Sequence, residues 1–200
     1  MPALPYNKPM KKLFPLFAAL TLLLSACGGS TSETNSTTPA EDSYFFTYKT
    51  AEFTIEVPST WATVNAFPSD VPEDVRVAFR NNIQERDFLA NVTVIRESKD
   101  QTISNADLSQ EKLADHEHHL LNYTLISQEE LQLSTAGSPS ATLLNTFQGK
   151  NDASSPTLTF QQAYLTKGNE AWTITASYDP DEDSFAVEKM NHMLKSFTLR

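Results

Sequence analysis

Apolar and polar residues alternate along several short segments of the first half of the chain. At 53–57 three apolar residues are separated by polar ones (FTIEV), and the same spacing recurs at 75–79. The segment 88–97 (FLANVTVIRE) has apolar residues in both alternating positions. Successive side chains of a strand point to opposite faces, so this period is typical of strands with one or both faces buried. We therefore predict three strands here.

The pattern changes to a helical one after residue 103. Ser104 or Asn105 is a candidate N-cap, and the segment 106–122 contains few helix breakers. Leu113 and Leu120 lie one heptad apart within it. This spacing predicts a helix over 106–122 that rests on the sheet.

Four further strands and a terminal helix are predicted in the second half. The strands are expected at 123–133, 140–149, 157–166 and 170–178, and Lys167-Gly168-Asn169 is typical of a hairpin turn between the last two. After Asp179-Pro180, the segment 181–196 is predicted to be a helix with acidic residues in its first turn. Together these elements predict an α+β fold with a central antiparallel sheet of about six or seven strands flanked by helices. Trp61 and Trp172 are expected in its core.

The first 27 residues follow a different pattern. Two lysines at 11–12 precede an apolar run over 13–24, and small residues come next. This order is that of a secretory leader, and the apolar run is too short to span a membrane as a helix. Residues 1–9 add nothing that a leader needs, so we expect translation to begin at Met10.

The end of this leader, Leu24-Ser25-Ala26-Cys27, resembles the lipobox of bacterial lipoproteins. The resemblance implies cleavage between Ala26 and Cys27 and a diacylglycerol thioether on Cys27, whose thiol is the nucleophilic group. Cys27 is the only cysteine in the chain, so it cannot form an internal disulfide. The alternative is an ordinary secretory signal that happens to contain a cysteine. The order of basic start, apolar run, lipobox and linker favours lipidation. In the lipoproteins that this segment resembles, an Asp after the lipidated cysteine favours retention in the inner membrane, so the resemblance implies that Gly28-Gly29 directs the protein to the outer membrane, facing the periplasm.

Composition and charge define the rest of the chain. The segment 28–42 (GGSTSETNSTTPAED) is rich in Gly, Ser and Thr and is expected to be a flexible tether. We therefore divide the chain into a leader (1–26), a lipidated cysteine with its tether (27–42) and a domain (43–200).

Without the leader, twelve cations and twenty-five acids give a net charge of −13. This charge argues against nucleic acid and against electrostatic attraction to anionic lipid.

A histidine-rich segment is the main candidate for chemistry. On the helix predicted over 106–122, Asp115 and His119 are four residues apart and could bind one metal ion, with His118 nearby. The imidazoles of His116 and His118 point in nearly opposite directions at about 100° per residue, so the three histidines do not converge. A structural zinc site needs four ligands, and this segment offers two or three. Partial packing of His116 against the sheet is the simpler interpretation.

Other reactive motifs are lacking in the sequence. The acidic run 179–183 (DPDED) has neither the spacing nor the glycine of an EF-hand loop. There is no G-x-S-x-G elbow and no phosphate-binding glycine loop, and lipidation would consume the only thiol. We therefore expect no enzymatic activity and no cofactor beyond the covalent lipid.

Several motifs in order resemble those of the PsbP-like family. They are Phe53-x-Ile55-x-x-Pro58-x-x-Trp61, Gly137 before an ATLL strand, the FQQAYL…AWTITAS hairpin and the closing MLKSF. The resemblance covers nearly all of 44–200. That family includes the extrinsic photosystem subunit, a Ran-binding nuclear import factor and bacterial envelope lipoproteins such as DcrB-like proteins. The resemblance implies a central antiparallel sheet flanked by helices and a role in binding or assembly, with no binding residues carried over.

The sequence thus predicts a lipid-anchored envelope protein whose domain binds a protein or cell-wall partner. The alternative is a periplasmic module that binds a small ligand or a metal through His116–His119.

Overall fold

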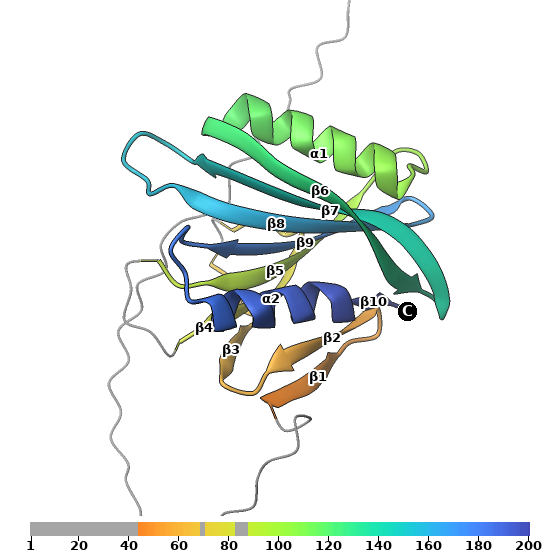
Figure 1. Ribbon diagram of the computed structural model, residues 1–200. Coiled ribbons are helices and arrows are strands. Elements are labelled where there is room, and N and C mark those ends of the chain that lie inside the picture. Colours follow the sequence, from red (N-terminus) through yellow and green to blue (C-terminus); the bar gives the residue numbers. More distant parts are fainter. Residues whose placement is uncertain (1–43, 69–70, 83–87) are drawn as a thin grey trace, which may run out of the picture.

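One ten-stranded sheet with a helix against each face forms the domain. The computed structural model describes residues 44–68, 71–82 and 88–200, and Figure 1 shows their arrangement. The strands are β1 (Phe45–Lys49), β2 (Phe53–Pro58), β3 (Trp61–Val64), β4 (Val75–Asn81), β5 (Asn91–Ser98), β6 (Leu121–Thr135), β7 (Ser138–Lys150), β8 (Leu158–Lys167), β9 (Glu170–Tyr178) and β10 (Thr198–Leu199). The helices are α1 (Asn105–His119) and α2 (Ser184–Ser196).

The strand order in the sheet is β1-β2-β10-β6-β7-β8-β9-β5-β4-β3. Every pairing is antiparallel except that of β10 with β6, which is parallel. A two-residue turn joins β6 to β7, and both of its residues, Ala136 and Gly137, have positive φ. Such turns match the right-handed twist of paired strands. The sheet curls so that β6 and β2 approach one another around β10 (Figure 1).

The α+β class and the seven predicted strands are confirmed, but the sheet is larger than predicted. β1, β3 and β10 were not predicted. β3 and β10 have only four and two residues, which is too short for a period of two to be recognised. β1 pairs with β2 at the sheet edge. It begins with two adjacent phenylalanines, Phe45 and Phe46, so its sequence does not alternate between apolar and polar residues.

The helix boundaries differ from the predicted ones at two places. Ser104 is the N-cap of α1, but the helix ends at His119 and not at residue 122, because Leu120 adopts an extended backbone. Leu120 packs so closely on Gly149 that a Cβ there would lie 2.9 Å from the Leu120 Cβ. The start of α2 was also predicted too early. Asp183 is its N-cap and accepts hydrogen bonds from two backbone N–H groups, so the predicted first-turn acids precede the helix.

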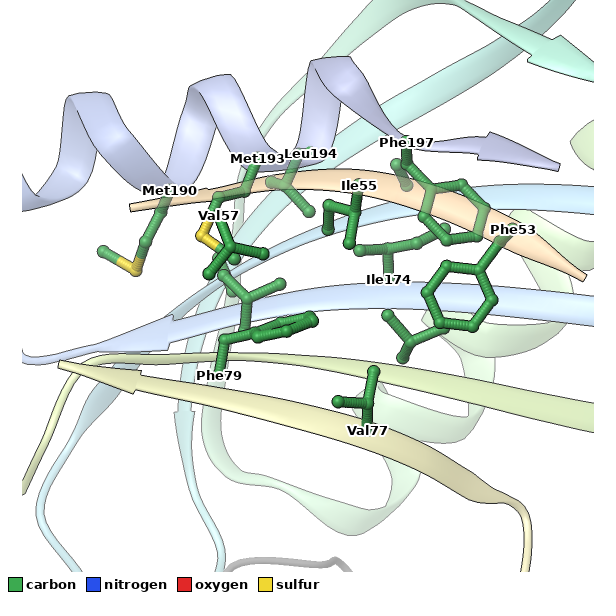
Figure 2. Packing of buried hydrophobic residues seen from close by; sticks show 14 of the residues in the cluster. Phe53, Ile55, Val57, Val77, Phe79, Ile174, Met190, Met193, Leu194 and Phe197 are labelled. Atoms are coloured by element: carbon green, nitrogen blue, oxygen red, sulfur yellow. The ribbon is translucent and has the colours of Figure 1, made fainter. Parts of the chain in front are cut away.

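The inner face of the sheet, which carries α2, holds the main core. Met190, Met193 and Leu194 of α2 point toward the sheet strands (Figure 2). Around them lie buried residues of β2, β4 and β9, including Phe53, Ile55, Val57, Val77, Phe79 and Ile174. Trp61 and Trp172 also belong to this core, as predicted. Burying each large side chain contributes about 1.5–3 kcal/mol.

The outer face of the sheet carries α1. Tyr164 and Ala171 pack with Leu108 of α1, whereas their chain neighbours Leu165 and Trp172 lie in the inner core. Successive side chains of β8 and β9 therefore point alternately into the inner core and into the layer beneath α1. All but the last two residues of β8 and the first of β9 are buried, as expected for strands covered on both faces.

The side chain of Asn105 joins β7 and β8 where their backbones separate. Their paired register ends at Leu144 and Ala163. Beyond that point Asn105 donates from Nδ2 to the Ala141 carbonyl oxygen (2.8 Å), and its Oδ1 accepts from the Thr166 N–H (2.8 Å). One amide thus replaces hydrogen bonds that the ladder no longer makes, and it fixes the start of α1 on the sheet.

We expect Asn105→Ala to lower the free energy of unfolding by about 1–3 kcal/mol, because it leaves the partly buried Thr166 N–H without its partner and removes the bond to the exposed Ala141 carbonyl oxygen. Urea denaturation of the full-length protein measures this change. Gln110→Ala, on the exposed side of the same helix, is the matched control and should change stability by less than about 0.5 kcal/mol. Equal stabilities of the two variants would contradict the bridging role.

Candidate functional site

The predicted lipidation site lies outside the part of the chain that the structure describes. Ala26, Cys27 and the tether all precede residue 44. Within the described ranges, no helix has the length and apolar character needed to cross a membrane. The site residues that the structure does place are those of α1.

His116 is packed against the sheet, as the simpler interpretation of the sequence predicted. Its ring stacks on Phe147 with 4.7 Å between centroids, and its Nε2 lies 3.0 Å from Gln162 Oε1. Burial lowers the pKa of His116 below its usual value, although the bond to Gln162 opposes this shift. The neutral ring therefore donates from Nε2 to the amide oxygen.

The other two histidines of the segment are exposed and do not converge with His116. His119 Nδ1 lies 2.7 Å from the backbone oxygen of Asp115, and the rings of His118 and His119 are 6.2 Å apart, edge to face. Among the described residues, no group of three or more His, Cys, Asp or Glu side chains could hold a metal ion. The structure thus brings Asp115 and His119 together through a backbone oxygen and not through the Asp115 carboxylate.

A buried network of polar side chains lies between α1 and the sheet. Asn145 donates to Ser109 Oγ (2.7 Å) of α1 and to the Tyr164 hydroxyl (3.1 Å), and Tyr164 donates to Gln162 Oε1 (2.9 Å). That same oxygen accepts from His116. Polar groups buried in such a network favour one helix position, because any shift would leave some of them unsatisfied. Sequence reasoning missed this network, and the only signal was the asparagine and glutamine inside otherwise buried strands.

A second polar contact fixes the middle of α1. Lys112 is buried and its Nζ lies 2.7 Å from Glu97 Oε1 on β5. Burial opposes ionisation of Glu97, but the charges of Lys112 and Lys99 outweigh it, so the pKa of Glu97 lies below its usual value. The Lys112 and His116 side chains therefore hold α1 on the sheet through their bonds to Glu97 and Gln162.

The surface offers two features suited to binding. One is an open cleft of about 340 Å³ between the β6–β7 turn and the last turn of α2, lined by residues that include Leu133, Pro139, Lys195 and Phe197. The other is β6 itself, most of whose residues are exposed although the strand is fifteen residues long. Leu125 and Ile126 are 41% and 53% exposed. These features suit the docking of another molecule.

Below about pH 6.5, the usual histidine pKa, the unfolded chain takes up a proton that buried His116 resists. We therefore expect the free energy of unfolding to fall as the pH is lowered from 7 through the reduced pKa of folded His116. His116→Gln should show a weaker decline in urea denaturation at pH 7.5, 6.5 and 5.5. His118→Gln, on the exposed side of α1, is the matched control. The same pH dependence in all three proteins would contradict this role of His116.

Comparison with known proteins identifies the fold. No protein-family model matches the chain, and a search of curated protein sequences gave no significant match. Among solved structures, cyanobacterial PsbP (CyanoP) from Synechocystis sp. PCC 6803 matches with a TM-score of 0.55 and 18% identity, covering 88% of this chain and 99% of that one.

Two further structures match with TM-scores of 0.51. The Ran-binding protein Mog1p of Saccharomyces cerevisiae is 12% identical, over 76% of this chain and 94% of its own. LpqN of Mycobacterium tuberculosis, described as involved in cell envelope biogenesis, is 13% identical, over 74% and 82%. The described domain therefore has the PsbP/Mog1 fold, which confirms at the level of the fold the resemblance found in the sequence.

Proposed function

We propose that this protein is a lipid-anchored component of the bacterial cell envelope whose domain binds another envelope component without catalysing a reaction. The observation that carries the proposal is the lipobox ending at Cys27, placed after a basic and apolar leader and before a polar tether. Several acyl chains give stable membrane attachment, whereas one chain gives only marginal attachment. The anchor is proposed to lie in the outer membrane, with the domain facing the periplasm.

The domain supports a binding role in two ways. LpqN, which shares the fold, is described as involved in cell envelope biogenesis, and Mog1p is described as a Ran-binding protein. At these identities the comparison concerns the fold, so the role itself is our inference. The exposed cleft and strand edge offer surfaces for a partner, whereas the buried polar groups beneath α1 are bonded to one another.

Charge narrows the class of partner. The mature chain is strongly acidic, so nucleic acid and anionic membrane surfaces are poor partners, and a basic protein or cell-wall component is a better one. A flexible tether of about fifteen residues would have an r.m.s. reach of about 20 Å, so the proposed tether would let the domain sample partners near the membrane.

Replacing Cys27 by Ser should abolish lipid attachment, because the hydroxyl cannot form the thioether. Metabolic labelling with palmitate, followed by mass spectrometry of the mature N-terminus, measures the result. Ser25→Ala, which keeps a small residue before the cut, is the matched control and should still be labelled. Palmitate incorporation into the Cys27→Ser variant, or an unmodified thiol in the wild type, would overturn the proposed anchor.

A further inference from the structure

We propose that the free edge of β6 binds an extended, basic segment of a partner protein as an added strand. The proposal rests on the binding role given above and names the surface and the chemistry that serve it. Adding a strand to an open sheet edge lets backbone hydrogen bonds supply affinity, while alternate side chains supply specificity.

One side of β6 is open along most of the strand. Its other side pairs with β7 from Leu121 to Thr135, whereas β10 covers only Ser134 and Thr135. The Ala136 N–H donates to the Leu199 carbonyl oxygen (2.7 Å), so it points to the β10 side. Backbone groups of a strand alternate between its two sides. Those of residues 128, 130 and 132 therefore point to the open side, where no described strand pairs with them.

A regular stretch of this edge is long enough to accept another strand. The pairing with β7 is continuous over 127–135, and its two irregularities fall between Leu121 and Ser127. Irregularities of this kind discourage pairing at an edge. The stretch 127–133 lacks them, and its seven residues match or exceed the usual strand length of about five or six.

The charges on this stretch select the partner. Glu129 and Glu130 are both exposed, and as consecutive residues of a strand they point to opposite faces of the sheet. Neither forms an ion pair with any cation in the described part of the chain. A strand with two consecutive lysines or arginines opposite them would place one cation on each face. Directly opposed charges of opposite sign stabilise paired strands.

A second copy of this chain is a less suitable occupant of the β6 edge than a basic segment. The domain over 43–200 carries twelve cations and twenty-two acids, so two copies meet with a net charge of −10 each. Pairing two β6 edges around the centre of the regular stretch would also bring the glutamates of one copy close to those of the other. The same residues that attract a basic segment therefore oppose pairing of the protein with itself.

The N-terminal end of the regular stretch offers apolar contacts. Leu125 and Ile126 are exposed just before it, whereas Leu133 and Phe197, which line the 340 Å³ cleft at its other end, are almost fully buried and belong to the core. The expected segment thus has two adjacent cations near its centre and apolar residues a few positions away on the side that meets Leu125 and Ile126.

A designed peptide tests the proposal with full-length protein in non-ionic detergent. The probe is a fluorescein-labelled peptide of about ten residues that alternates threonine and valine around a central Lys-Lys pair, and the comparison peptide carries Glu-Glu there. Fluorescence anisotropy should show that wild type prefers the Lys-Lys peptide. In E129K/E130K the preference should reverse, with the Lys-Lys peptide weakened about tenfold.

A backbone variant separates strand addition from simple charge attraction. Gln132→Pro removes an N–H that points to the open side and spares the ladder with β7, so it should weaken binding about tenfold. Gln132→Ala keeps that N–H and should bind as wild type does. Circular dichroism and thermal unfolding check that each variant is folded.

The proposal is overturned if wild type binds neither peptide below about millimolar concentration, or if Gln132→Pro and E129K/E130K bind the Lys-Lys peptide as wild type does. A concentration-dependent dimer that Gln132→Pro abolishes, seen by analytical ultracentrifugation, would replace the basic segment by a second copy. Lipid labelling of Cys27 reports on the proposed anchor independently, so a failure of the edge and a failure of the anchor are distinguishable.

Discussion

The structure depends on the burial of both faces of the β8–β9 hairpin. These strands pair continuously from Thr159 with Tyr178 to Lys167 with Glu170, and neighbouring residues such as Tyr164 and Leu165 enter different layers. A shift of one residue in their register would exchange the two layers and leave polar groups in the inner core. The hairpin therefore fixes which face receives α1 and which receives α2, and the remaining strands extend the sheet from its two sides.

The two faces are held by different physical interactions. The inner core is apolar and aromatic, with the Phe53 ring 5.3 Å from that of Phe197 and 5.7 Å from that of Trp172. The outer face combines aromatic packing with directional polar contacts through Asn105, Lys112, Asn145 and His116. Hydrophobic burial is not directional, whereas a buried hydrogen bond requires one geometry. The polar contacts thus give α1 a defined position that its apolar residues alone would specify weakly.

The sequence predicted those features that depend on local periodicity. A period of two indicated the first strands, β-rich runs between turn signals indicated the later ones, and the two helices followed from segments with few breakers. Features that depend on distant partners were not predictable. Nothing local indicates that Asn105 bridges β7 and β8 or that two residues after α2 form β10 between β2 and β6. The packed state of His116 could be inferred, since it lies at the edge of the apolar stripe, but its bond to Gln162 depends on the register of β8.

Open edges are the main risk of a sheet that does not close on itself, and this domain treats its edges differently. β3 has four residues and β1 has five, so neither offers a long template for another chain. β6 is three times as long as β1 and open along most of its length, with an irregular first part and adjacent glutamates in the regular part. Those glutamates discourage acidic or identical strands. They would not discourage a basic one, so the charge that protects this edge from self-association also determines which kind of partner it can accept.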